Sequence, residues 1–263
     1  MARVTVLTAT YNRAHLLAET IRSVLGQTFT DLEYIIVDDG STDSTARVVQ
    51  SLAEQDSRIH YVVQPHAGLA ATWETLFALA KGEYVAWLSD DDLWDETFLE
   101  RTIHALDENP DATVAYADYL NLIDENLVPA PEPRRCSLSI EHLLYGCFIS
   151  MCLALIRRSA LKQVRTYLGS YFDPIGGSAC GDWVLFLNLW PLGRFVHICE
   201  PLGTLRLHAE QDSVTTSVLE LARRRFAVRR KYAKIPFSMA LREAAELVAW
   251  GTYNRLRKRL REK

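Results

Sequence analysis

The first hundred residues alternate between short apolar runs and longer segments whose apolar residues recur at helical spacing. The apolar runs predict strands at 4–7, 32–37, 59–63 and 84–88. The segments between them predict helices at 13–27, 44–55 and 70–80. Strands that are apolar on both faces and alternate with amphipathic helices are typical of βαβ units. The sequence therefore predicts an α/β domain with a parallel sheet.

Beyond residue 95 the pattern is less regular. We expect a helix to about residue 107, a strand at 113–119, an apolar run at 151–156, a short buried helix at 182–189 and a pair of strands within 195–207. The Pro-rich segment VPAPEPRR (128–135) predicts an exposed loop rather than a linker between domains.

Four polar segments follow the four predicted strands: TATYNR (8–13), DDGSTDST (38–45), QPHAG (64–68) and SDDD (89–92). In parallel sheets, ligands bind outside the carboxyl ends of the strands. Helix capping by Asp43 or Ser44 is an alternative explanation for the second segment. Capping does not explain two acidic clusters on one edge of the sheet, so we expect a binding site of the nucleotide-binding type there.

Asp90, Asp91 and Asp92 end a strand that is otherwise apolar. Neighbouring carboxylates repel one another and lose hydration when they are buried, so this position requires a positive charge. Carboxylate oxygens suit Mg²⁺ or Mn²⁺, which also bind phosphate groups of substrates. The alternative is a solvated acidic turn that caps a helix beginning near Asp95.

Five segments together resemble the glycosyltransferase family 2 in order and spacing. They are VTVLTATYNR, LEYIIVDDGSTDST, GLAATWETLFALAKGEYVAWLSDDDLW, GDWVLFLNL and LRLH, and the resemblance covers residues 2–215. It implies the GT-A fold, an α/β fold with a Rossmann-like sheet. It also implies transfer of a sugar from a nucleotide diphosphate donor, with inversion at the anomeric carbon and with Mn²⁺ or Mg²⁺ on the diphosphate.

The resemblance also implies roles for individual residues on the donor side. Asp39 would receive the edge of the base, with Thr10 and Tyr11 nearby, which favours uracil or thymine. Asp91 would bind the metal with Asp92 next to it, and Asp90 would reach the ribose. Ser89 stands where the family commonly has a first aspartate. The full set expected to bind the donor nucleotide is Thr8, Ala9, Thr10, Tyr11, Arg13, Asp38, Asp39, Asp90 and Arg206.

Three further residues are implied near the reacting groups. Asp182 in the sequence CGDW would be the general base that deprotonates the acceptor hydroxyl, although the same residue would also serve as a helix cap. Arg206 would reach the diphosphate, and His208 would complete the metal ligands, unless His208 is only a polar surface residue. Trp73 and Glu74 depart from an Arg-Asn pair that is common in the family.

The net charge of −4 conceals an asymmetry. Residues 217–263 hold 14 Lys and Arg against 4 Asp and Glu, so this part carries about +10 and the preceding part about −14. We therefore divide the chain into a GT-A domain at 1–215 and a basic amphipathic helical tail at 216–263. Within the domain, 1–95 is the donor-binding half and 96–215 the acceptor-binding and catalytic half.

The tail is interpreted as a surface for an anionic membrane or a partner helix, or as a pair of helices packed on the domain. No nucleic-acid recognition motif is present in the sequence. The first residues lack the layout of a secretory signal, and no apolar run reaches the length of a membrane span. The five cysteines form no CxxC pair, which favours reduced thiols. We expect a cytoplasmic protein, held at the inner face of the membrane if its acceptor is lipid-linked.

The sequence thus predicts a metal-dependent inverting glycosyltransferase that uses a UDP- or dTDP-sugar and a glycan or lipid-linked acceptor in surface polysaccharide synthesis. A sugar-phosphate nucleotidyltransferase is one alternative, but TATYNR has none of the glycines expected of its phosphate loop. A non-enzymatic membrane-binding module centred on the basic tail is the other.

Overall fold

The computed structural model of this chain describes residues 2–123, 126–129, 139–146, 149–171, 175–176, 180–207 and 218–233. Its strands are β1 (Val4–Thr10), β2 (Leu32–Asp38), β3 (Ile59–Val63), β4 (Tyr84–Trp87), β5 (Leu93–Trp94), β6 (Ala112–Ile123), β7 (Asn126–Pro129), β8 (Ala154–Arg157) and β9 (Arg194–Arg206). Its α-helices are α1 (Ala14–Leu25), α2 (Thr45–Ala53), α3 (Leu69–Leu79), α4 (Phe98–Asp107), α5 (Ile140–Tyr145), α6 (Arg158–Leu168), α7 (Gly181–Leu189) and α9 (Val218–Tyr232). Two 3₁₀ turns lie at Met151–Leu153 and Trp190–Leu192.

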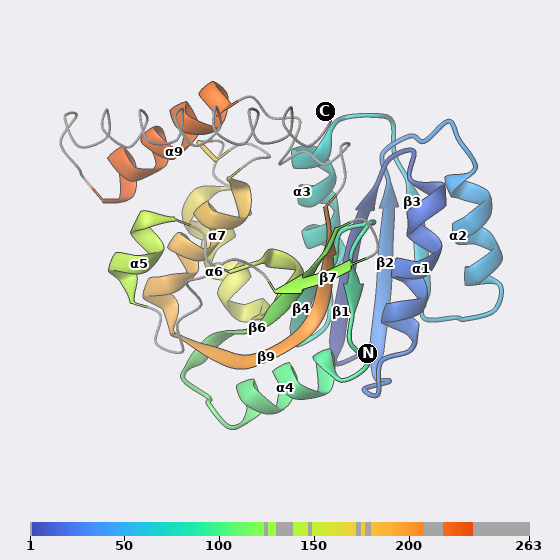
Figure 1. The fold of residues 1–263 in the computed structure, drawn as a ribbon, viewed down its shortest axis with the longest axis horizontal. Coiled ribbons are helices and arrows are strands. Elements are labelled where there is room, and N and C mark those ends of the chain that lie inside the picture. The colour runs from blue at the N-terminus through green and yellow to red at the C-terminus, as the bar shows by residue number, and fades with distance from the viewer. Residues whose placement is uncertain are drawn as a thin grey trace.

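The described strands form one nine-stranded sheet in the order β3-β2-β1-β4-β8-β6-β9-β5, with β7 paired to β6. β3, β2, β1 and β4 are parallel, as the sequence predicts, and every residue of β1 is buried. α1 and α2 contact each other beside these strands, while α3 packs on β1 and β2 (Figure 1). The strands and helices predicted in the first hundred residues are all present.

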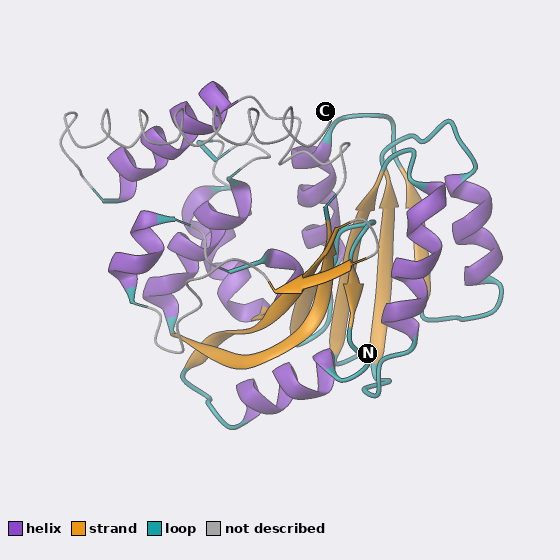
Figure 2. Cartoon of the chain, viewed as in Figure 1, coloured by secondary structure: helices purple, strands orange, loops and turns teal. Residues whose placement is uncertain are grey.

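The second half of the sheet is mixed rather than parallel. β8 is antiparallel to β4 and β6, and β9 runs parallel to β6 along a curved path (Figures 1 and 2). The prediction of two strands within 195–207 was wrong, because irregularities in register let one long strand continue past Pro201. β7 continues to Pro129, where the sequence predicts a loop.

α7 is a short helix whose residues are nearly all buried, as the sequence predicts for this segment. A helix that is apolar on nearly every side is stable only when it is covered, and α5 and α6 both contact α7. Trp183 is 2% exposed and its Nε1–H donates to the carbonyl of Leu143 at 2.6 Å. This packing fixes the N-terminal end of α7, where Asp182 lies.

α9 confirms a helix in the first part of the basic tail. Ala222 and Val228 are buried, and α9 contacts α5. The Tyr232 hydroxyl accepts a hydrogen bond from Asn188 of α7 at 2.9 Å. The tail residues 234–263 lie outside the described residues. Among the helices that the structure describes, none has the length and apolar character needed to cross a bilayer.

Candidate active site

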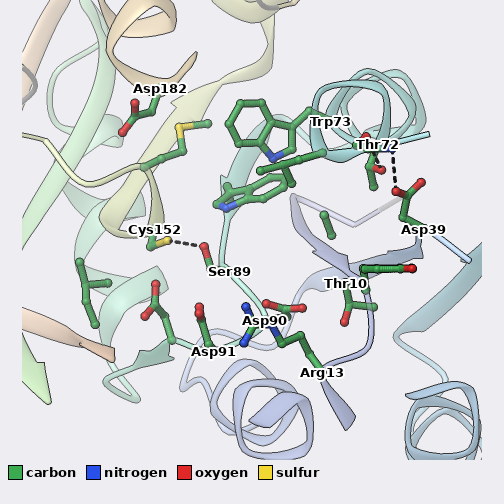
Figure 3. A pocket seen from close by; sticks show the side chains of 18 of the residues that line it. Thr10, Arg13, Asp39, Thr72, Trp73, Ser89, Asp90, Asp91, Cys152 and Asp182 are labelled. Carbon is green, nitrogen blue, oxygen red and sulfur yellow. Dashed lines mark hydrogen bonds between the residues drawn. The ribbon is translucent and has the colours of Figure 1, made fainter. Parts of the chain in front are cut away.

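A cavity of about 530 Å³ lies at the carboxyl ends of the parallel strands, between the two halves of the sheet (Figure 3). This volume is within the range of small-molecule sites. The predicted residues that line it are Ala9, Thr10, Tyr11, Arg13, Asp39, Asp90, Asp91, Asp92 and Asp182. The acidic residues that the sequence assigns to one edge therefore meet at one cavity.

Two loops that shape this cavity are tied together by Asn12. Its φ of 54° is in the left-handed region, which asparagine tolerates better than most residues. Its side-chain oxygen accepts hydrogen bonds from the backbone N–H groups of Thr42 at 2.8 Å and Asp43 at 3.3 Å. Asp43 in turn accepts from the backbone of Ala14 at 3.2 Å. The loop after β1 is thus fixed against the loop after β2, and Tyr11 is left exposed at the cavity.

The carboxylate of Asp39 is surrounded by donors. It accepts from Gln64 Nε2 at 2.7 Å and from the backbone N–H groups of Ala67 at 3.0 Å and Gly68 at 2.8 Å. Burial opposes ionisation of Asp39, but these hydrogen bonds outweigh it and hold the pKa of Asp39 below its ordinary value. Asp39 is therefore an ionised hydrogen-bond acceptor in the lining of the cavity.

His66 covers Asp39 on the cavity side. Its Nδ1 lies 2.9 Å from Asp39 Oδ2, and its ring stacks on Tyr11 with centroids 4.4 Å apart. The sequence assigns no role to His66, although it belongs to the polar segment after β3. Its position at a strand end is the sequence signal by which His66 could have been found.

Thr8 and Asp38 lie below the cavity and do not line it. The Thr8 hydroxyl donates to the carbonyl of Leu88 at 2.7 Å, and Asp38 accepts from the Ser41 backbone at 2.7 Å and the Tyr61 hydroxyl at 2.5 Å. Both side chains are nearly fully buried. Their observed contacts hold the strands and loops in place.

The three aspartates after β4 differ in their surroundings. Burial raises the pKa of Asp90 to about 7 and the charge of Asp91 adds to the rise, while the Thr10 hydroxyl and Arg13 oppose it. Burial and the charge of Asp91 also raise the pKa of Asp92 well above its ordinary value. Asp90, Asp91 and Arg13 lie side by side on the cavity floor (Figure 3).

The raised pKa values of Asp90 and Asp92 indicate that too little positive charge surrounds these carboxyl groups to hold them ionised. The atoms on the cavity floor that could bind a metal are carboxylate oxygens, the ligands that Mg²⁺ and Mn²⁺ prefer. Within the part of the chain that the structure describes, no three His, Cys, Asp or Glu side chains converge on one metal position. Asp91 lines the cavity, where its oxygens are accessible to a cation that also binds a substrate phosphate.

Asp92 and Arg206 connect the cavity floor to β9. The Arg206 backbone N–H donates to Asp92 Oδ1 at 3.0 Å, and the Arg206 side chain forms an ion pair with Glu19. Arg206 does not line the cavity, and its predicted contact with the diphosphate stays a prediction. His208 lies outside the described residues.

Asp182 lies across the cavity from Asp39 (Figure 3). It is the second residue of α7, so it lies within the first turn and is not the cap residue, which is Cys180. Its Oδ1 accepts the backbone N–H of Trp183 at 2.7 Å. A carboxylate in this position is favoured by the helix dipole.

Several lining residues were not predicted. Besides His66 they are Gly68, Leu69, Thr72, Trp73, Trp87, Ser89, Ser150, Met151, Cys152 and Leu205. Ser89 Oγ and Cys152 Sγ lie 3.2 Å apart, and Trp73 meets Trp87 edge-on with centroids 5.3 Å apart. Cys152 follows a loop with no readable motif, so no sequence signal indicated it.

Glu74 joins the two halves of the site. Its Oε1 accepts from the Ser170 hydroxyl and from the Tyr171 backbone N–H, the latter at 2.9 Å. Both residues follow α6, so α3 is fixed to the segment that comes directly after α6. Glu74, at a position where this sequence departs from the Arg-Asn pair common in the family, thus has a structural role.

Comparison with known proteins agrees with this arrangement. The family model described as Glycosyl transferase family 2 matches residues 5–165. An uncharacterized glycosyltransferase of Nostoc sp. is 37% identical over 225 residues, 82% of this chain and 68% of that protein. A putative teichuronic acid biosynthesis glycosyltransferase of Bacillus subtilis is 31% identical over 154 residues, 56% of this chain and 61% of that protein. A UDP-Glc:alpha-D-GlcNAc-diphosphoundecaprenol beta-1,3-glucosyltransferase of Escherichia coli is 27% identical over 197 residues, 73% of this chain and 72% of that protein.

Solved structures show the same fold. S. aureus TarS in complex with UDP-GlcNAc superposes with a TM-score of 0.70 at 15% identity, covering 94% of this chain and 71% of that one. A mannosyltransferase from Pyrobaculum calidifontis in complex with GDP-Man and Mn²⁺ gives a TM-score of 0.64 at 20% identity, covering 96% of this chain and 75% of that one. The chain therefore belongs to glycosyl transferase family 2 and is a glycosyltransferase of the GT-A fold.

Proposed function

We propose that the chain is a metal-dependent, inverting glycosyltransferase that moves a sugar from a UDP- or dTDP-sugar to a hydroxyl group of a glycan or lipid-linked acceptor. The product would belong to a surface polysaccharide. The observation that carries this proposal is the single cavity lined by Asp39, the acidic floor and Asp182. A base-recognition group, a diphosphate-metal position and a general base are the three parts that such a transfer needs.

The donor base would bind at Asp39. A carboxylate held ionised by hydrogen bonds accepts the ring N–H of uracil or thymine, and Tyr11 offers an aromatic face beside it. The UDP-GlcNAc and UDP-Glc in the names of similar proteins support a UDP-sugar donor, while GDP-Man in another shows that the fold alone does not choose the base.

The diphosphate would lie over the cavity floor, where Asp91 would hold the cation, with Asp92 and His208 beside it. Bound there, Mn²⁺ or Mg²⁺ supplies positive charge that stabilises the departing nucleoside diphosphate. Asp90 would bind the ribose, and Arg13 adds positive charge next to the phosphates. The Mn²⁺ in a solved neighbour supports this assignment.

Asp182 would act as the base. Its carboxylate accepts the proton of the acceptor hydroxyl while that oxygen bonds to the anomeric carbon and the bond from this carbon to the diphosphate breaks. The acceptor enters on the face opposite the diphosphate, so the configuration inverts. One protein carboxylate suffices because the leaving group needs no proton from the protein, in contrast to a glycosidase, which needs a second carboxyl group as acid.

The acceptor side favours a membrane-linked substrate. α9 packs on the domain through Ala222 and Val228 and exposes Arg223, Arg230 and Lys231. Exposed cations on a helix attract anionic lipid surfaces, and such a surface at the inner face of a membrane is where a lipid-linked acceptor is found. Flotation of the protein with anionic vesicles tests the membrane contact alone. We expect flotation to be lost when these three residues are replaced by Glu.

The experiment that tests the reaction uses Asp182→Asn, with Asp31→Asn, on an exposed loop, as the matched control. We expect Asp182→Asn to bind the donor as the wild type does and to lose transfer by at least about 100-fold, because the substitution removes the base and keeps its shape. Released UDP, rather than pyrophosphate, separates this reaction from nucleotidyl transfer. Transfer by Asp182→Asn at the rate of the control would contradict the role of Asp182.

A further inference from the structure

A second group of reactive side chains lies where β6 pairs with β9, away from the cavity. In that pairing Tyr116 is opposite His197 and Ala117 is opposite Ile198, but the next residue, Asp118, is opposite Pro201. Cys199 and Glu200 are therefore extra residues on β9 that form a bulge. Bulges turn side chains out of the regular ladder, and Cys199 is exposed.

His197 lies between Cys199 and Asp118. Its Nε2 is 3.0 Å from Asp118 Oδ1, and its Nδ1 is 3.6 Å from Cys199 Sγ. The His197 side chain is only 4% exposed, and its ring stacks on Tyr116 with centroids 4.6 Å apart and an interplanar angle of 6°. The imidazole is therefore held in one orientation by contacts on its face and at both nitrogens.

The contact with Asp118 determines which nitrogen carries the proton. A carboxylate only accepts hydrogen bonds, so Nε2 is the protonated nitrogen of the neutral ring and Nδ1 presents its lone pair to the thiol. The Cys199 S–H then donates to Nδ1. If the proton moves to His197, Asp118 stabilises the resulting imidazolium. A thiol, a base and a carboxylate that orients the base are the arrangement that activates nucleophilic cysteines.

We propose that Cys199 is a reactive thiol, activated by His197 and oriented through Asp118, and that it forms mixed disulfides with small disulfides in solution. In this step His197 Nδ1 takes the thiol proton and the Cys199 sulfur attacks one sulfur of the disulfide. A new S–S bond forms, the original S–S bond breaks, and the departing thiolate takes up the proton. Cys199 and one sulfur of the reagent are joined while the other sulfur leaves as a thiol, so no further oxidant is needed.

The other described cysteines offer internal comparisons. Burial raises the pKa of Cys180 to about 11 and the pKa of Cys152 well above its ordinary value, so both thiols are protonated and inaccessible near neutral pH. Cys152 also lies in the cavity, whereas Cys199, His197 and Asp118 do not line it. This site is thus separate from the sugar-transfer site.

The test measures the rate of glutathionylation of each cysteine at pH 7 in the full chain, with glutathione disulfide as the probe. Samples are quenched with acid, digested with trypsin and analysed by mass spectrometry. Cys199 lies alone on peptide 195–206, and Cys180 lies alone on peptide 166–194. The reference is the synthetic peptide 195–206, which contains Cys199 and His197 without Asp118 and without the fold.

We expect Cys199 in the folded protein to react at least tenfold faster than the reference peptide. Asp118→Asn keeps the shape and removes the charge that stabilises the imidazolium, so the rate should fall at least fivefold, and it should fall further in His197→Gln. Cys180 should remain unreactive in every variant. Circular dichroism verifies the fold of each variant, and the comparison of wild type with peptide needs no variant at all. A rate in the wild type that is no greater than that of the peptide would overturn the proposal, as would equal rates in wild type and Asp118→Asn.

Discussion

His66→Ala should strengthen the binding of UDP, because His66 contacts Asp39 and Tyr11, the two groups proposed to bind the donor base. Its Nδ1 lies 2.9 Å from Asp39 Oδ2, and its ring stacks on Tyr11 at 4.4 Å. The Asp39 carboxylate receives three hydrogen bonds, from Gln64, Ala67 and Gly68. A pyrimidine N–H that approaches Asp39 must therefore displace the imidazole first.

The size of the effect follows from the contacts that His66 loses when UDP binds. The hydrogen bond from His66 Nδ1 to the backbone carbonyl of Asp39 at 3.1 Å and the contact of Nδ1 with the Asp39 carboxylate, from a side chain that is 58% exposed, together contribute about 1 kcal/mol. One aromatic stack adds about 0.5 to 1 kcal/mol. Together they predict a Kd for UDP that is roughly ten- to thirtyfold lower in His66→Ala.

Calorimetric titration with UDP and Mn²⁺ measures this change. His104→Ala is the matched control, because His104 is an exposed residue of α4 outside the cavity. Weaker binding by His66→Ala than by the control would refute the reasoning and would mean that His66 contacts the base instead of competing with it. If the wild type itself does not bind UDP, the assignment of a UDP donor is contradicted. This result is distinct from weaker binding by His66→Ala alone.

Two further predictions concern stability, and each is measured by denaturant unfolding. Asp39→Asn places an NH₂ group against donors that now face an oxygen, which should lower the free energy of unfolding by about 1 to 3 kcal/mol at pH 7. Because the pKa of Asp39 is lowered in the folded state, the stability that ionised Asp39 contributes is complete above the unfolded pKa of about 3.9 and is lost as the pH falls through the folded pKa. The difference in unfolding free energy between wild type and variant should therefore shrink below about pH 4. A constant difference down to pH 2 would contradict the assignment. Gly82→Ala would put a Cβ atom 2.7 Å from Thr5 N and 2.9 Å from Arg3 O, both backbone atoms, and should cost about 1 to 3 kcal/mol; an unchanged unfolding midpoint would show that β1 and β4 have room to separate.

The sequence predicted the parallel half of the fold because its signals there are local. Each of those strands is a mainly apolar run, and each is followed by polar residues at the same edge of the sheet. Asp39, Asp91 and the loop at Tyr11 were therefore assigned to one place. The helix that carries Asp182 was also predicted, because the mainly apolar segment 182–189 follows a Gly-rich stretch and is stopped by Pro191.

The second half depends on contacts between distant residues. β9 remains one strand through Pro201 because β6 pairs with it on both sides of the bulge at Cys199 and Glu200. The two-residue strand β5 pairs with Gly203 and Thr204. Likewise, the position of His66 over Asp39 results from a tertiary contact between β2 and the loop after β3. No periodicity in the sequence encodes such contacts.

The most direct test of the account is a titration of the wild-type protein with UDP in the presence of Mn²⁺ and then of EDTA, with Asp91→Asn in parallel. The account predicts that UDP binds with Mn²⁺, that EDTA removes most of this affinity, and that Asp91→Asn binds weakly under both conditions. Equal affinity with Mn²⁺ and EDTA in the wild type, unchanged in Asp91→Asn, would contradict the claim that the aspartates after β4 hold a metal and the donor diphosphate.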